Sequence, residues 1–138
     1  MRNKTKQEMV EEFHETFGRP VRESFFQYRQ EKDKREYWLR IKLIKEELQE
    51  LEDALSDEDQ VETLDAVVDI LYLVYGAALQ FGFSEELIDA AFKEVHTSNM
   101  SKLDEEGKPI YREDGKILKG PNYFKPNIKK LIRKFSVI

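Results

Sequence analysis

The sequence predicts an all-α protein, an antiparallel helical bundle with a four-helix core and an irregular C-terminal arm. Apolar residues recur at helical spacing through four segments of the first hundred residues, and no segment shows a strand-like alternation. Glycine and proline then become frequent. The length of 138 residues is that of one ordinary domain. We therefore expect a single domain over 1–138, made of a helical core (1–100) and a loop-rich basic arm (101–138).

The first two helices follow from their apolar faces. Residues 5–17 form the first, which Gly18 and Pro20 end, and a long helix is expected over about 34–55, whereas residues 21–33 are ambiguous. The apolar positions are Met9, Val10, Phe13 and Phe17 in the first helix, and Tyr37, Ile41, Ile44, Leu48, Leu51 and Leu55 in the second.

Turn and capping residues set the remaining boundaries. The sequence "SDED" at 56–59 supplies a turn and an acidic N-cap for a third helix, which ends before Gly82. Ser84 begins a fourth helix over 84–99. Beyond it we expect turns, a short hairpin across "EDGK" and a basic helix over 127–135.

Composition excludes several classes of function. A net charge of −5 argues against a general nucleic-acid coat protein, and the lack of cysteine excludes disulfides, thiolate metal sites and a cysteine nucleophile. The N-terminus is polar and lacks a signal-peptide pattern. The longest apolar run, 61–76, carries three carboxylates, which cost several kcal/mol at bilayer depth. We therefore expect a cytoplasmic protein with no membrane or nucleic-acid partner.

An acidic stripe runs along this apolar helix. On a helical wheel Glu62, Asp65 and Asp69 fall in one narrow sector with Tyr72 and Gly76, while the remaining circumference is apolar. A helix that is apolar nearly all round is normally buried nearly all round. A buried carboxylate must be protonated, paired or bound to a metal.

The preceding helix supplies a second acidic set, Glu46, Glu47 and Glu50 in "EELQE". The short turn makes the two helices antiparallel neighbours, so the two sets can face each other. Neither set contains a basic residue, and Mg²⁺ prefers oxygen ligands. We therefore predict Mg²⁺ between the helices. The other acids nearby are interpreted as a solvated helix face: Glu52, Asp53, Asp57, Glu58 and Asp59.

These motifs resemble a known family. "EELQE" resembles the E-E-x-x-E motif of the all-α nucleoside triphosphate pyrophosphohydrolases, the MazG-like and phosphoribosyl-ATP pyrophosphohydrolase-like superfamily. "DAVVDILYLVYGAALQFG" is similar to a branch whose second helix reads D-x-x-x-D-x-x-Y-x-x-x-G. The segments "VEEFHETFG" and "EVHTSNMSKLDEEGKPIYREDGKILKGPNYFKPNI" are similar to the same branch.

The resemblance implies a Mg²⁺-dependent cut between the α- and β-phosphates of a nucleotide, with Mn²⁺ as an alternative metal and nucleotide-pool house-cleaning as the role. Glu46, Glu47 and Glu50 match the first motif, and Asp69 matches the aspartate of the second. Three residues before Asp69 the family has Glu, where this chain has Ala66. We take Asp65 as the substitute ligand.

The remaining roles are those of the general base and of the groups that bind the substrate. The general base is expected to be Glu46 or Glu47, and the residues that bind the substrate phosphates are expected to be Asn99, Lys102 and Lys119. Because the third helix is apolar on more sides than the few helices can cover, and because the family assembles this way, we expect a homodimer or homotetramer.

Two other classes of function stay open. The chain could be a helical module that senses a nucleotide or a metal without hydrolysis, or a structural helical protein with an acidic face. The identity of the nucleotide, the choice between dimer and tetramer, and the role of Glu62 also stay open.

Overall fold

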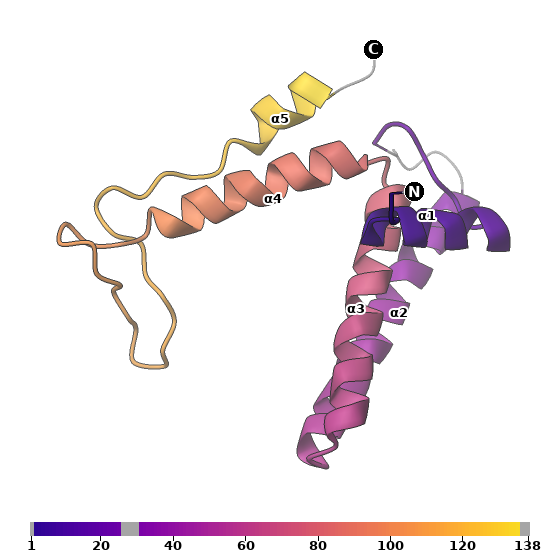
Figure 1. The fold of residues 1–138 in the computed structure, drawn as a ribbon, viewed down its shortest axis with the longest axis horizontal. Coiled ribbons are helices and arrows are strands. Elements are labelled where there is room, and N and C mark those ends of the chain that lie inside the picture. Colours follow the sequence, from indigo (N-terminus) through magenta and orange to yellow (C-terminus); the bar gives the residue numbers. More distant parts are fainter. Residues whose placement is uncertain (1, 26–30, 136–138) are drawn as a thin grey trace. The chain divides into compact units, whose positions relative to one another are not determined.

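In the computed structural model, residues 2–25 and 31–135 are described, and they contain five α-helices (Figure 1). The all-α class predicted from the sequence is confirmed. At the expected hairpin the chain reverses across residues 112–116, with one antiparallel bridge between Tyr111 and Ile117 and a hydrogen bond of 2.7 Å from the Arg112 amide to the Lys116 carbonyl. The helices are α1 (Lys6–Phe17), α2 (Glu31–Ser56), α3 (Gln60–Gln80), α4 (Glu85–Met100) and α5 (Ile128–Phe135).

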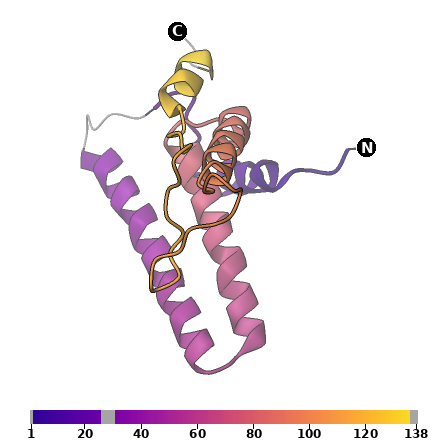
Figure 2. The same cartoon turned by 90° about the vertical axis from the view of Figure 1, so that its left-hand side faces the viewer.

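The chain divides into two compact units, Met1–Ser84 and Glu85–Ile138. The first holds α1, α2 and α3, and the second holds α4, the arm and α5. Within the first unit, α2 and α3 form an antiparallel hairpin closed by the short turn at 57–59 (Figure 2). This hairpin carries both acidic sets.

The predicted end of the first helix and the predicted cap of the third are present. Thr5 and Glu8 form a capping box at the start of α1, and Gly18 ends that helix in the left-handed region with φ 71°. Asp59 caps α3, because its carboxylate accepts a hydrogen bond from the Glu62 amide at 3.1 Å. Of the ambiguous stretch 21–33, residues 31–33 are helical and residues 26–30 lie outside the described residues.

The expectation that α3 is buried nearly all round is wrong for a single chain. Leu64 is 64% exposed and Val68 is 50% exposed, and Leu71 and Val74 are exposed as well. The buried positions of α3 are instead small or lie near its C-terminal end: Ala66, Gly76, Ala77, Leu79 and Gln80. Within the first unit, α2 and α1 cover only part of the surface of α3.

Arg22 fastens the segment after α1 to the ends of α2 and α3. Its backbone N–H donates to the Leu79 carbonyl at 3.0 Å, and its guanidinium donates to the Gln80 carbonyl at 2.9 Å. The same guanidinium lies 2.9 Å from the Glu36 carboxylate and 3.6 Å from that of Asp33. These contacts fix the position of residues 19–25 against the end of the hairpin opposite its turn, where α2 begins and α3 ends.

In the second unit, serine hydroxyls attach the arm to α4. Buried Ser98 donates its hydroxyl to the Phe124 carbonyl at 2.8 Å, and Ser101 Oγ accepts from the Phe124 amide at 3.2 Å. A Cβ at Gly120 would lie 1.9 Å from the Leu103 carbonyl oxygen, so glycine is required where the arm returns. In the described ranges, no single helix is long and apolar enough to cross a membrane, and α3 with α4 meets this test only as a bent pair.

Candidate active site

The five predicted metal ligands lie on the two arms of the hairpin. Glu46, Glu47 and Glu50 belong to α2, and Asp65 and Asp69 belong to α3. Glu47 and Asp69 are partly buried, whereas the other three are exposed. Each helix therefore contributes one partly buried carboxylate, Glu47 from α2 and Asp69 from α3.

Glu47 has the most perturbed carboxyl group of the cluster. Burial is the largest cause, followed by hydrogen bonding to Glu50, which favours the protonated form, and by the charges of Asp69, Glu50 and Asp65; together they raise the pKa of Glu47 from 4.5 to about 7. The charges of two aspartates on α3 thus act on a glutamate of α2. The structure brings Glu47, Glu50, Asp65 and Asp69 into one electrostatic cluster.

Asp69 belongs to the same electrostatic cluster. Its pKa is also raised, first by burial and then by the charges of Asp65 and Glu50. Burial and neighbouring acids thus raise the pKa of one carboxyl group on each of the two helices.

One carboxylate oxygen of the cluster has no partner. Oε2 of Glu47 is shielded from solvent and has no hydrogen bond within the described chain. No ion pair in the described ranges involves any of the five acids. A shielded acceptor among uncompensated negative charges fits a hard divalent cation, whose oxygen ligands are of this kind.

The acids are not already arranged around one point. Among residues 2–25 and 31–135, no three side chains of His, Asp or Glu form a group that could hold a metal ion as they stand. Mutual repulsion keeps like charges apart when no cation lies between them. The donor chemistry of the cluster fits Mg²⁺, and each ligand assignment stays a prediction.

An acidic hollow of about 330 Å³ adjoins this cluster toward the turn of the hairpin, and it is open to solvent. Glu50 belongs to both the cluster and the hollow. The sequence predicts a solvated face for Asp53, Asp57 and Asp59, and it leaves the role of Glu62 open. Its lining residues are Glu50, Asp53, Ala54, Asp57, Asp59 and Glu62.

The predicted phosphate-binding residues lie in the second unit. Asn99 is exposed in the last turn of α4, and Lys102 is partly buried just beyond it. The Lys119 ammonium lies 4.9 Å from the centre of the Tyr123 ring. Because Gly120 packs on the backbone carbonyls of residues 102 and 103, the chain segments that carry Lys102 and Lys119 lie side by side.

Three comparisons relate the chain to known proteins. Uncharacterized protein L479 of Acanthamoeba polyphaga mimivirus is 33% identical over 135 residues, which cover 96% of this chain and 49% of that protein, so the chain spans about half the length of this relative. A crystal structure of a candidate NTP pyrophosphohydrolase from Exiguobacterium sp. 255-15 is 22% identical, with 96% of each chain covered and a TM-score of 0.49. The family of phosphoribosyl-ATP pyrophosphohydrolases matches residues 10–99, which include both helices of the acid cluster. The chain belongs to the phosphoribosyl-ATP pyrophosphohydrolase family.

Proposed function

We propose that the chain is a Mg²⁺-dependent nucleoside triphosphate pyrophosphohydrolase, which cleaves between the α- and β-phosphates and releases a monophosphate and pyrophosphate. The observation that carries this proposal is the interaction of Glu47 with Asp69 across α2 and α3, in a chain of this family. A cluster of carboxylates without cationic partners suits a metal-bound polyphosphate.

The acids on the hairpin would hold the metal. Glu46, Glu47, Glu50, Asp65 and Asp69 are the proposed ligands. When bound, Mg²⁺ neutralises phosphate oxygens and favours attack by water. Glu47 is the better candidate for the general base, because a carboxyl group whose pKa is raised to about 7 can accept a proton near neutral pH. Glu46 is the alternative.

The substrate would be bound by cationic and amide groups of the second unit. Lys102, Lys119 and Asn99 offer donors for phosphate oxygens. The proposed role is removal of unwanted nucleotides from the pool, in the cytoplasm. The substrate is a (d)NTP in this proposal, and phosphoribosyl-ATP belongs in the same test because it names the family.

The active form is proposed to be a homodimer or homotetramer. One flank of α3 beside the acid stripe is apolar and exposed, and the apolar side chains that share it are Val61, Leu64, Val67, Val68, Leu71 and Val74. Contiguous apolar surface of this kind typically lies in an interface. A second copy of the chain would supply the missing cover for α3.

A product analysis tests the activity. The purified chain is incubated with Mg²⁺ or Mn²⁺ and a panel of NTPs, dNTPs and phosphoribosyl-ATP, and the products are separated by ion exchange. A nucleoside monophosphate and pyrophosphate support the proposal. Binding of a nucleotide without turnover would indicate a sensing module instead.

A further inference from the structure

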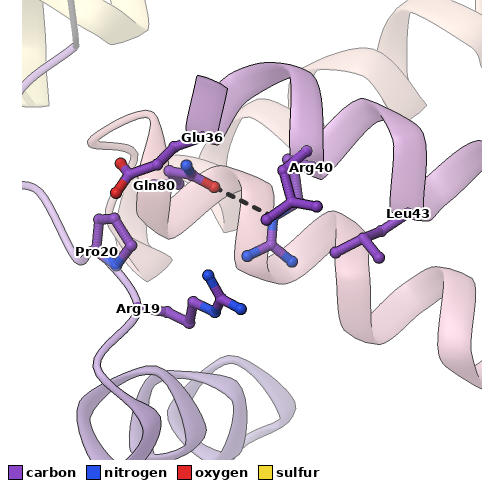
Figure 3. Close-up of a pocket in the computed structure, with 7 residues that line it drawn as sticks. Arg19, Pro20, Glu36, Arg40, Leu43 and Gln80 are labelled. Atoms are coloured by element: carbon purple, nitrogen blue, oxygen red, sulfur yellow. Dashed lines mark hydrogen bonds between the residues drawn. The ribbon is translucent and has the colours of Figure 1, made fainter. Parts of the chain in front are cut away.

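A second polar centre lies in the first unit, at the end of the hairpin opposite the turn. A cavity of about 20 Å³ opens there between the segment after α1 and the helices α2 and α3 (Figure 3). This volume accommodates about one particle the size of a water molecule. The cavity is lined by Arg19, Pro20, Glu36, Leu39, Arg40, Leu43 and Gln80.

Arg40 is a buried cation without an anionic partner among the described residues. It is 7% exposed, and the hydrogen bond of its side chain joins Nε to the neutral Gln80 amide oxygen at 3.2 Å. Within residues 2–25 and 31–135 no carboxylate lies within ion-pair distance of Arg40. The remaining positions, 1, 26–30 and 136–138, contain no Asp or Glu side chain. Burial of an unpaired charge costs free energy, and a guanidinium group does not lose its proton in a protein to avoid that cost.

Two other side chains around Arg40 do not neutralise its charge: Arg19 is a second cation, and His14 is neutral. Arg19 points toward the same cavity (Figure 3), and burial and the charge of Arg19 both lower the pKa of Arg40. His14 is 2% exposed, its Nδ1 lies 3.0 Å from the Pro20 carbonyl oxygen, and burial is the largest cause of its lowered pKa. The imidazole is therefore neutral at pH 7 and offers no negative charge.

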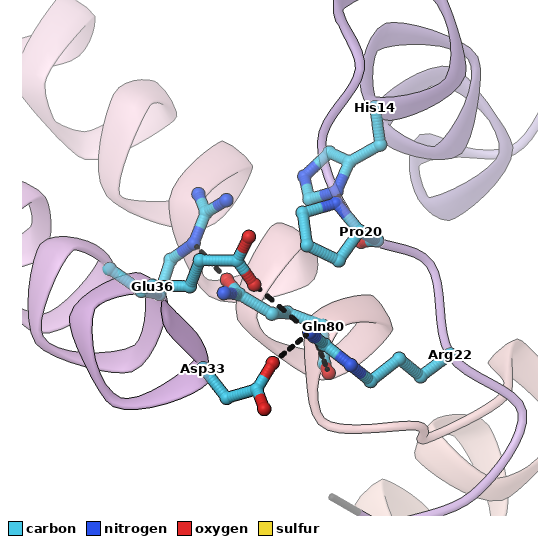
Figure 4. A network of polar contacts seen from close by, with 7 residues as sticks. His14, Pro20, Arg22, Asp33, Glu36 and Gln80 are labelled. Atoms are coloured by element: carbon cyan, nitrogen blue, oxygen red, sulfur yellow. Dashed lines mark hydrogen bonds and ion pairs between the residues drawn. The ribbon is translucent and has the colours of Figure 1, made fainter. Parts of the chain in front are cut away.

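The carboxylates nearest the cavity are already engaged. Arg22 pairs with both Asp33 and Glu36 (Figure 4), and Glu36 is the acidic group in the lining of the cavity. Among the described residues, two carboxylates thus stand against three guanidinium groups, those of Arg19, Arg22 and Arg40. Arg19 is exposed, but Arg40 is buried, and an unpaired buried charge is expensive.

We propose that this cavity binds a small monovalent inorganic anion of the size of chloride, held by the guanidinium groups of Arg40 and Arg19. One negative charge balances the excess, and the cavity is too small for a tetrahedral oxyanion. The Gln80 amide accepts from Arg40 through its oxygen, so its NH₂ group is a further donor in the lining of the cavity. The side chains of Leu39 and Leu43 form an apolar wall, which strengthens the attraction between the ion and the arginines.

The test measures thermal unfolding of the whole chain against halide concentration. Sodium chloride or bromide replaces sodium gluconate at constant ionic strength, so that only the size and chemistry of the anion change. We expect the midpoint to rise by roughly 5 °C and then to level off, because a ligand bound only by the folded state stabilises it. A response to gluconate equal to that to chloride would overturn the proposal.

Variants assign the response to the cavity. Arg19→Gln removes one of the two arginines at an exposed position, so the fold tolerates it, and it should shift half-saturation to at least about tenfold higher halide. Arg40→Gln should abolish the response if that chain folds. Arg35→Gln, an exposed arginine of the same helix outside the cavity, should keep the parent response. An unchanged response in Arg19→Gln would overturn the site.

Crystals grown or soaked in bromide give an independent readout. An anomalous peak is expected between the Arg19 and Arg40 guanidinium groups, and a water molecule alone at that place would contradict the proposal. Neither readout uses nucleotide hydrolysis, so failure of the anion site and failure of the proposed activity are distinguishable.

Discussion

Asp69 on α3 acts electrostatically on the carboxyl group of Glu47 on α2, and burial raises the pKa of both groups. Two helices thus hold two acids in an interaction that no ion pair within residues 2–25 and 31–135 relieves. The free energy cost of this arrangement depends on pH and on divalent ions, and both dependences are measurable.

The pH dependence of stability tests Glu47. Its pKa rises from 4.5 to about 7 on folding, so the folded state binds the extra proton between these values. Stability from this group is therefore fully present below pH 4.5 and is lost as the pH rises through 7. Glutamine does not ionise, so Glu47→Gln keeps this stability at high pH. We expect the free energy of unfolding of the variant to exceed that of the parent by an amount of the order of 1–3 kcal/mol at pH 8.

Urea unfolding at pH 5 and pH 8, without divalent ions, measures this difference. The matched control is Glu52→Gln, an exposed acid of the same helix, which should follow the parent at both pH values. An advantage of Glu47→Gln that is equal at the two pH values would show that the pKa of Glu47 is not raised.

Metal binding tests the cluster as a whole. Calorimetric titration with Mn²⁺ should show binding by the parent chain, and Glu50→Gln and Asp69→Asn should each weaken it by at least about tenfold, because each removes an anionic oxygen ligand. The Glu52→Gln variant should bind like the parent, since that side chain lies on the exposed face. Parent-like affinity in both ligand variants would place the metal elsewhere.

Local signals in the sequence predicted the helices and their ends well. Asp59 and Gly18 act as the cap and the stop that their residue types favour. Such features depend on neighbours within a few residues, which is why a single sequence reveals them. The facing of the acid sets also followed from a local feature, the short turn between α2 and α3.

Burial was less predictable, because periodicity shows which residues share a face but not which face the chain itself covers. Asp65 lies in an apolar helix and is nevertheless exposed, and the oxygen without a partner belongs to Glu47 in the more highly charged helix. The pairing of Arg40 with Gln80 joins residues 40 positions apart. Nothing in the local pattern distinguishes Arg40 from a surface arginine.

Gly76→Ala tests the packing of α1 against the hairpin. Alanine usually stabilises a helix interior by about 1 kcal/mol relative to glycine. At this position, however, a Cβ would lie 2.7 Å from His14 Nε2 and 3.0 Å from Arg40 Nη1, so buried side chains must move. We expect a net loss of about 1–2 kcal/mol in the free energy of unfolding.

A double-mutant cycle provides the control for this clash. In a His14→Ala background the nearest obstacle is gone, so the same glycine substitution should cost less than in the parent. Chemical unfolding of the four chains gives the coupling. A Gly76→Ala chain as stable as the parent would mean that the His14 imidazole moves aside without a cost in stability.

Leu71→Asp tests the proposed assembly. Leu71 is 46% exposed on the apolar flank of α3, so a carboxylate there should cost the single chain little but should be poorly tolerated in an interface between copies. We expect sedimentation at low micromolar concentration to show an oligomer for the parent and a monomer for the variant. Asn122→Asp adds the same charge at an exposed position of the arm and should stay oligomeric. A parent chain that is monomeric at this concentration contradicts the proposal.

The chemistry itself is tested by Asp69→Asn, which keeps the shape of the side chain and removes its charge. If Asp69 is a metal ligand, the turnover rate should fall by at least about 100-fold, since a bound metal supplies several kcal/mol of transition-state stabilisation. The thermal midpoint without metal should stay level or rise, because Asp69 raises the pKa of Glu47 and its removal relieves repulsion in the cluster. A loss of rate with a parallel loss of stability would point to a structural role instead. Ion-exchange separation of the parent's products then decides the bond that is cleaved: orthophosphate with a nucleoside diphosphate as the main products would exclude attack between the α- and β-phosphates, whatever the effect of the variant.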